Sequence, residues 1–190
     1  MLFKRDIEKS LEVLRNGGLI LYPTDTIWGI GCDATNEKAI ERINQLKGRS
    51  KSKNLIILLE NENNLTSYVH EVADVAYELI EYTEKPLTIV YTGAKNLPSS
   101  LIADDGTIGI RIVKHDFCEE LIRRFRKPII STSANFSNQP APKNFSEIDP
   151  DIIEGVDYVV EYQQDDMEER AASTIIKLGP SGQFEFIRKA

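Results

Sequence analysis

The chain has 190 residues, with 23 Lys and Arg against 30 Asp and Glu, and a formal net charge of −7. Hydrophobic residues make up 41% and charged residues 28%, an ordinary globular composition that excludes disordered, collagen-like and coiled-coil chains. Two cysteines and two histidines exclude a disulfide framework or a cysteine-type zinc site and leave little room for histidine-based catalysis. The apolar runs are too short to cross a bilayer, so we expect a cytoplasmic protein of one domain, residues 1–190, with no membrane contact.

Helical and strand patterns alternate along the chain. Apolar residues at helical spacing predict helices with buried faces at 7–14, 40–46, 72–80 and 117–125. Asp6 and Asn36 are the expected N-caps of the first two, and Gly17 and Gly48 follow their ends. Short apolar runs predict strands at 19–22, 55–59, 87–91, 107–113, 129–131, 156–160, 174–178 and 184–187. The segments 93–106 and 137–146 are expected to be loops. These alternating strands and helices, joined by short connections, indicate one α/β domain.

The segment from Tyr22 to Gly31 follows a predicted buried strand and is dense in hydroxyl side chains and glycines. Loops at the carboxyl ends of strands are where α/β sheets bind ligands. The segment has neither the spacing of a phosphate-binding loop nor that of a dinucleotide fingerprint. A turn whose Thr and Asp side chains bond their own backbone is the structural alternative, and the residues leave both open.

A basic segment carries Lys47, Arg49, Lys51 and Lys53 between the second helix and the strand at 55–59. The helix dipole accounts for one or two of these cations, but four within seven residues repel one another unless an anion joins them. Arg offers a planar fork and Lys a point charge to a phosphate or carboxylate. In an acidic chain the pattern favours a confined anionic ligand over a long polyanion, with a solvated charged surface as the alternative.

The segment from Ile130 to Ser137 ends a predicted strand in small polar residues, among them Ser133 and Asn135. Such residues can bond the polar groups of a substrate, or can simply begin a loop by bonding backbone groups. A serine hydrolase is disfavoured, because the segment has no Gly-x-Ser-x-Gly elbow and neither histidine is placed as a base.

Arg111 lies within an apolar strand, on the same face as Thr107 and Gly109. A cation there is costly unless it is paired, so we expect an acidic partner or an anionic ligand. Ser173 and Thr174 begin a later strand and would pass for ordinary polar strand residues if they stood alone.

Taken together and in this order, these segments resemble the YrdC domain family in its short form, the threonylcarbamoyl-AMP synthases of tRNA modification. The resemblance extends from about residue 10 to the C-terminus. It implies a single α/β domain with a twisted mixed sheet and flanking helices around a positively charged concave cavity. The matching segments are 22–31, 47–58, 107–111, 128–137 and 173–174, with Arg188 near the end.

The resemblance also implies a reaction in which L-threonine, bicarbonate and ATP give L-threonylcarbamoyladenylate and pyrophosphate. Mg²⁺ would be carried with ATP, no metal site would be built from the protein, and a partner enzyme would transfer the product onto a tRNA adenosine. Transient contact with tRNA or with that transferase is possible. The residues implied for L-threonine are Thr26, Arg111, Ser133 and Ser173. Those implied for the nucleotide are Arg49, Lys53, Thr107, Asn135, Lys143 and Arg188, with Lys47 and Arg49 as the catalytic pair.

The sequence departs from the family pattern at a few positions. Ser50 and Asn54 replace common prolines, and Asn138 stands where Gly is usual. Leu58 stands where longer members have His, and Lys143 where a Thr often helps to bind nucleotide. A paralogue in the same fold, acting as a non-catalytic RNA- or nucleotide-binding protein, is the alternative function.

The implied chemistry needs no protein nucleophile. The amine of threonine attacks bicarbonate or CO₂, and the resulting carboxylate attacks the α-phosphate of ATP. Catalysis would then consist of positioning the substrates and neutralising phosphate charge.

Overall fold

The computed structural model describes residues 2–49 and 55–189, which form an α/β fold around one mixed sheet. The helices are α1 (Leu2–Arg15), α2 (Glu37–Leu46), α3 (Leu65–Tyr68), α4 (Asp74–Tyr82), α5 (Asp116–Phe125) and α6 (Pro150–Glu154), with single 3₁₀ turns η1 (Glu62–Asn64) and η2 (Phe145–Glu147). The strands are β1 (Ile20–Tyr22), β2 (Gly29–Gly31), β3 (Ile56–Leu59), β4 (Leu87–Tyr91), β5 (Ile108–Ile112), β6 (Ile129–Ser133), β7 (Tyr158–Val159), β8 (Thr174–Leu178) and β9 (Phe184–Arg188).

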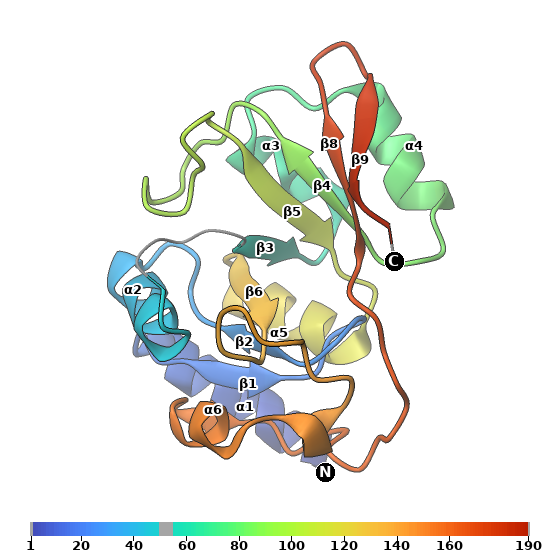
Figure 1. The fold of residues 1–190 in the computed structure, drawn as a ribbon. Coiled ribbons are helices and arrows are strands. Elements are labelled where there is room, and N and C mark those ends of the chain that lie inside the picture. Colours follow the sequence, from blue (N-terminus) through green and yellow to red (C-terminus); the bar gives the residue numbers. More distant parts are fainter. Residues whose placement is uncertain (1, 50–54, 190) are drawn as a thin grey trace.

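The nine strands among these residues follow the order β7-β1-β2-β6-β3-β5-β4-β8-β9. Three neighbouring pairs are parallel, namely β1 with β7, β3 with β5 and β4 with β8, and the others are antiparallel. Helix α4 lies at the β8–β9 end of the sheet, whereas α1, α5 and α6 lie towards β1 (Figure 1). The predicted twisted mixed sheet with flanking helices is therefore confirmed.

Register places several predicted site residues on one face of this sheet. Ile56 of β3 lies opposite Gly109 of β5 and opposite Ser131 of β6. Because side chains two residues apart share a face, Arg111 and Ser133 project to the same side as these three. Ser133 in turn lies opposite Gly29 of β2, so the β1–β2 turn enters at the same edge.

The helix predictions are confirmed where the signals are local. The Asn36 side chain accepts a hydrogen bond from the Ala39 N–H and caps α2, as expected. Helix α1 ends before Gly17, which has a φ of +74°, a conformation that glycine adopts without strain. All four apolar residues of the predicted 117–125 face are buried in α5.

The prediction that Asp6 caps the first helix is wrong. Helix α1 begins at Leu2, and Asp6 is a fully buried residue within it. Its carboxylate accepts hydrogen bonds from the Tyr158 hydroxyl at 2.6 Å and from the N–H groups of Glu161 and Tyr162. The strong N-cap preference of Asp is overridden here by partners about 150 residues away.

The segments 93–106 and 137–144 form no helix or strand, in agreement with the predicted loops, although η2 begins at Phe145. Strand β2 and helices α3 and α6 were not predicted. No helix among the described residues is long and apolar enough to cross a membrane.

Candidate functional site

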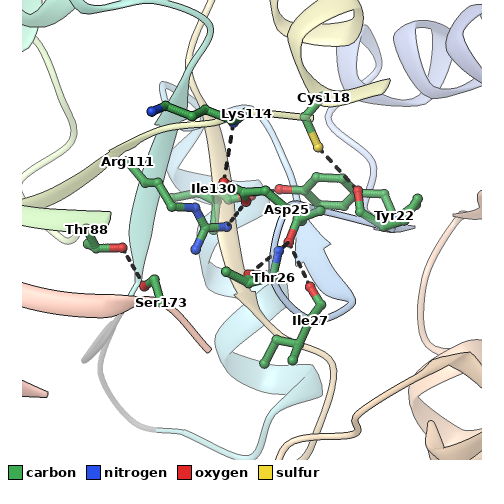
Figure 2. Close-up of polar contacts among 12 residues, drawn as sticks. Tyr22, Asp25, Thr26, Ile27, Thr88, Arg111, Lys114, Cys118, Ile130 and Ser173 are labelled. Carbon is green, nitrogen blue, oxygen red and sulfur yellow. Dashed lines mark hydrogen bonds and ion pairs between the residues drawn. The ribbon is translucent and has the colours of Figure 1, made fainter. Parts of the chain in front are cut away.

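A buried ion pair joins β5 to the turn between β1 and β2. A terminal nitrogen of Arg111, Nη2, lies 3.2 Å from Asp25 Oδ1, and the two side chains are only 4% and 5% exposed. The Lys114 backbone N–H donates to the other oxygen of Asp25 at 3.3 Å (Figure 2). The acidic partner expected for Arg111 is therefore present, and it is Asp25.

The turn that carries Asp25 is held by hydroxyl groups. Thr24 Oγ1 lies 3.0 Å from Thr26 Oγ1, accepts the Thr26 N–H and donates to the Ile27 carbonyl. Both threonines are buried. The structural alternative thus holds for Thr24, whereas Asp25 faces Arg111 and Thr26 keeps further hydrogen-bonding capacity.

A second group of polar side chains lies next to Arg111, where β4, β8 and β9 meet. The buried hydroxyls of Thr88 and Ser173 are 2.8 Å apart (Figure 2). Arg188 donates from Nε and Nη2 to the Ser173 carbonyl at 3.0 and 2.8 Å. Burial and, secondly, repulsion from Arg111 lower the pKa of Arg188, which places the two guanidinium groups in one electrostatic neighbourhood.

Lys47, at the end of α2, is almost fully buried and contacts the end of β6. Its Nζ donates to the carbonyl oxygens of both Ser133 and Asn135. Burial, followed by repulsion from Arg49, lowers the pKa of Lys47 to about 7. The ammonium group therefore holds the backbone of the 133–135 turn in place.

Arg49 and Asn135 complete a second cluster around that turn. Arg49 Nε donates to Ser137 Oγ at 2.9 Å, and Arg49 Nη2 lies 3.4 Å from Thr132 Oγ1. Asn135 donates its amide hydrogens to the carbonyls of Phe136 and Gln139, while its buried Oδ1 has no hydrogen-bond partner among the described residues. Burial lowers the pKa of Arg49.

The other predicted nucleotide residues lie at the margins. Thr107 donates to Asp105 at 2.6 Å, and Asp105 pairs with Lys177. Lys143 pairs with Glu169 at 2.8 Å, which raises the pKa of Lys143. Lys53, together with Ser50 and Asn54, lies outside the described residues, so the structure places none of these three.

Two hollows adjoin these residues. One of about 10 Å³ lies between Thr26 and Lys143 and is also bordered by Asp166 and Glu168 of the acidic segment. The other, about 200 Å³, borders Asp25 and Lys114 on the far side of the Arg111 ion pair. The positive charge expected for the cavity stays a prediction.

The structure thus brings Thr26, Arg111, Ser173 and Arg188 together in one cluster, and Lys47, Arg49, Ser133 and Asn135 in another. Sequence reasoning missed the contributions of Asp25 and Thr88. Asp25 stands inside the hydroxyl-rich segment already singled out, and Thr88 is a polar residue in an otherwise apolar strand. Those signals were present but did not reveal the partners.

An α/β sheet that brings a buried arginine, further arginines, small hydroxyls and an asparagine together defines a domain that binds a small anionic or zwitterionic ligand. The Sua5/YciO/YrdC family model, described as "Telomere recombination", matches residues 12–190. The chain belongs to this family.

The comparisons include both curated sequences and solved structures. A threonylcarbamoyl-AMP synthase of Pseudoalteromonas translucida is 33% identical over 158 residues, which cover 82% of this chain and 84% of that protein. E. coli YciO superposes with a TM-score of 0.84 at 25% identity, over 98% of this chain and 89% of that one. P. abyssi Sua5 complexed with L-threonine gives a TM-score of 0.80 at 26% identity over 90% of this chain. The match covers only half of the P. abyssi Sua5 chain.

Proposed function

We propose that the chain is an L-threonylcarbamoyladenylate synthase, which joins L-threonine, bicarbonate and ATP and releases pyrophosphate. The observation that carries the proposal is the buried cluster around Arg111. Its guanidinium comes from β5, and the hydroxyls of Thr26 and Ser173 come from the β1–β2 turn and from the residue before β8. It suits an amino acid that has both a carboxylate and a hydroxyl. Relatives named threonylcarbamoyl-AMP synthase support the same reading.

In this proposal the two clusters divide the substrates between them. Arg111 pairs with the carboxylate of threonine, while Thr26, Ser173 and Ser133 bond its hydroxyl and amine. Arg49, Asn135 and Arg188 hold the nucleotide, together with Thr107, Lys143 and Lys53. Lys143 would exchange Glu169 for a phosphate, because an exposed ion pair of this kind contributes little and is easily replaced.

The proposed role of Lys47 changes with its position. Its ammonium donates to two backbone carbonyls, so we assign it to shaping the 133–135 turn and to adding positive potential behind the phosphates. Arg49, which is half-exposed, is the better candidate for direct contact with the charge that develops on the leaving pyrophosphate.

Mg²⁺ would arrive on the phosphates of ATP. The described residues contain no group of three or more His, Cys, Asp or Glu side chains that could hold a metal ion. Mg²⁺ often keeps its waters and relies on substrate phosphates, so this donor set fits an ion carried by the nucleotide. Neutralisation of phosphate charge is the chemistry that it would supply.

Pyrophosphate release tests the proposal. We expect release that requires ATP, L-threonine and bicarbonate together, with threonine preferred over serine and serine over valine, because a site that bonds a hydroxyl rejects the analogue lacking it. Replacing Arg49 with Ala should lower kcat/KM at least tenfold, since a charge-assisted contact contributes roughly 1.5–3 kcal/mol. Arg123→Ala, on the exposed face of α5, is the matched control and should retain wild-type turnover.

Release without threonine, or equal turnover of valine and threonine, would contradict the proposal. The second candidate is a non-catalytic paralogue that binds RNA or nucleotide, and it rests on the departures from the family pattern at Ser50, Asn54 and Asn138. RNA affinity that falls steeply with rising salt concentration, without any pyrophosphate release, would favour it. We further propose that the enzyme works in the cytoplasm and passes its product to a tRNA-modifying transferase.

A further inference from the structure

We infer that Asp25 is a positioning residue for the amino-acid substrate: it holds one end of the Arg111 guanidinium so that another edge is presented to the substrate carboxylate. This inference rests on the proposed function and deepens it. It assigns to Asp25 a task that the pattern of hydroxyls and glycines in its own segment does not indicate.

The first argument is the geometry of the pair. Arg111 reaches Asp25 through Nη2 alone, at 3.2 Å, although a guanidinium has five N–H donors and can engage a carboxylate with two of them. Asp25 is itself fixed from behind, because its second oxygen accepts the Lys114 N–H. The other oxygen, Oδ1, faces Arg111 in the ion pair but has no hydrogen-bond partner among the described residues, so the Lys114 N–H is the hydrogen bond that anchors this carboxylate.

The second argument is the Nε–H donor of Arg111. Arg111 Nε is buried and has no hydrogen-bond partner among the described residues. A buried, unpartnered donor on a charged side chain is unfavourable, and its presence calls for an acceptor in the working state. The hydroxyls of Thr88 and Ser173 are bonded to each other, and Ser173 is also contacted by Arg188, so neither compensates Nε.

The third argument is electrostatic. Arg188 and Arg111 are close enough for Arg111 to lower the pKa of Arg188, so the site holds the buried cation Arg111, the more exposed cation Arg188 and one carboxylate. A substrate carboxylate would balance the second charge. Asp25 therefore orients Arg111 and balances one positive charge, and the second positive charge remains for the substrate carboxylate to balance.

The alternative is that Asp25 competes with the substrate for Arg111. Competition requires that the substrate displace Asp25 from the guanidinium. Because the Lys114 N–H anchors Asp25 and a different edge of Arg111 is unused, the substrate can bind without that displacement. The two roles predict opposite effects when Asp25 loses its charge.

Asp25→Asn tests the inference through the separate Michaelis constants for the two substrates. We expect the KM for L-threonine to rise at least tenfold and the KM for ATP to stay within twofold. Asp25→Glu keeps the charge but displaces it by one methylene, so the threonine KM should rise less. A double variant that combines Asp25→Asn with Arg111→Lys should have a threonine KM no higher than that of the more impaired single variant, because Asp25 acts through Arg111.

Asp33→Asn is the matched control. Asp33 is also buried and pairs with a cation, Lys127, at 2.7 Å, but it lies outside both clusters. This variant should keep both KM values. If it raises the threonine KM as Asp25→Asn does, the effect reflects general destabilisation and the inference is wrong.

A threonine KM that falls or stays within twofold in Asp25→Asn overturns the inference, as does an equal rise in both KM values. Should Asp25→Asn not fold by circular dichroism, Asp25→Glu decides by the same criterion. Threonine-induced stabilisation against heat, measured without ATP, provides a readout independent of turnover. A wild-type protein that is stabilised by threonine but releases no pyrophosphate contradicts the proposed reaction, yet still allows the role of Asp25 to be tested.

Discussion

At the scale of single residues, Lys47 shows how burial changes what a side chain can contribute. The sequence places it among four closely spaced cations, but the structure directs its ammonium to the carbonyls of Ser133 and Asn135. Its neighbour Arg49 instead reaches the hydroxyls of Thr132 and Ser137. Two cations two residues apart therefore have different tasks, one in holding the turn and one on its open side.

The lowered pKa of Lys47 gives a pH prediction. In the unfolded chain Lys47 titrates near 10.5, and in the folded protein burial lowers its pKa to about 7. Between these values the unfolded state binds more protons, so this group makes folding more favourable as pH rises, and that gain is lost progressively as pH falls from 10.5 to about 7. The free energy of unfolding of the wild type, relative to Lys47→Met, should increase between about pH 7 and pH 10. Urea denaturation at intervals across this range measures it, and a constant difference would show that the pKa of Lys47 is not lowered.

At the scale of elements, sequence prediction succeeded where neighbouring residues decide the structure. Helix α2 follows from its Asn36 cap and its apolar face, and strands β4 and β8 follow from their apolar runs. Strand β2 is only Gly29, Ile30 and Gly31, and it exists because β1 and β6 pair with it from either side. A three-residue run with two glycines carries no strand signal of its own, so no local rule finds it.

The glycines of β2 are explained by packing. A Cβ on Gly31 would lie 2.6 Å from the Tyr22 ring and 2.8 Å from the Ile130 carbonyl oxygen, and the latter cannot move without opening the sheet. On Gly29 it would meet the hydroxyl of Ser131 at 3.2 Å.

The candidate site could be predicted only in part. Its residue types are visible in the sequence, but the partners of Arg111 and Ser173 are set by strands that pair across the sheet.

Asp6 provides a stability prediction at this scale. Its carboxylate joins α1 to the end of β7 through three hydrogen bonds, and the residue is inaccessible to solvent. Replacing it with Asn removes the charge and one acceptor oxygen, which should lower the free energy of unfolding by about 2–3 kcal/mol. Glu8→Gln, two residues away on the exposed side of α1, should change it by less than about 0.5 kcal/mol. Chemical denaturation of both variants checks the difference; equal effects would mean that the Asp6 contacts add nothing.

At the scale of the whole molecule, a chain with a net charge of −7 brings Arg111 of β5 and Arg188 of β9 near one another in its sheet. An acidic protein repels ATP at long range, so nucleotide binding depends on the local field of Arg49, Arg188 and their neighbours. Threonine is a zwitterion with no net charge and responds far less to that field. The two substrates should therefore differ in their response to salt.

This difference can be measured directly. Raising NaCl from 50 to 500 mM at constant Mg²⁺ shortens the screening length from roughly 14 Å to roughly 4 Å. We expect the KM for ATP to rise several-fold and the KM for threonine to change less than twofold. Parallel changes in both constants would indicate a general effect of salt on the fold, and no change in either would mean that the cations contribute little to nucleotide binding.

The contact between Arg188 and Ser173 also bears on how the protein matures. Strands β1 to β6 are made first and can bury most of the apolar core, whereas β9 emerges from the ribosome after them. Until residue 188 is released and docked, the contact of Arg188 with Ser173 is absent, and a nascent chain would be largely folded but would lack this part of the Arg111 cluster. A protease that cuts the exposed turn at residues 179–183 would detach that strand and leave the remaining eight covalently continuous. Such a clipped chain would keep much of its fold but lose Arg188 from the cluster, so an intact β9 would indicate an active protein better than solubility does.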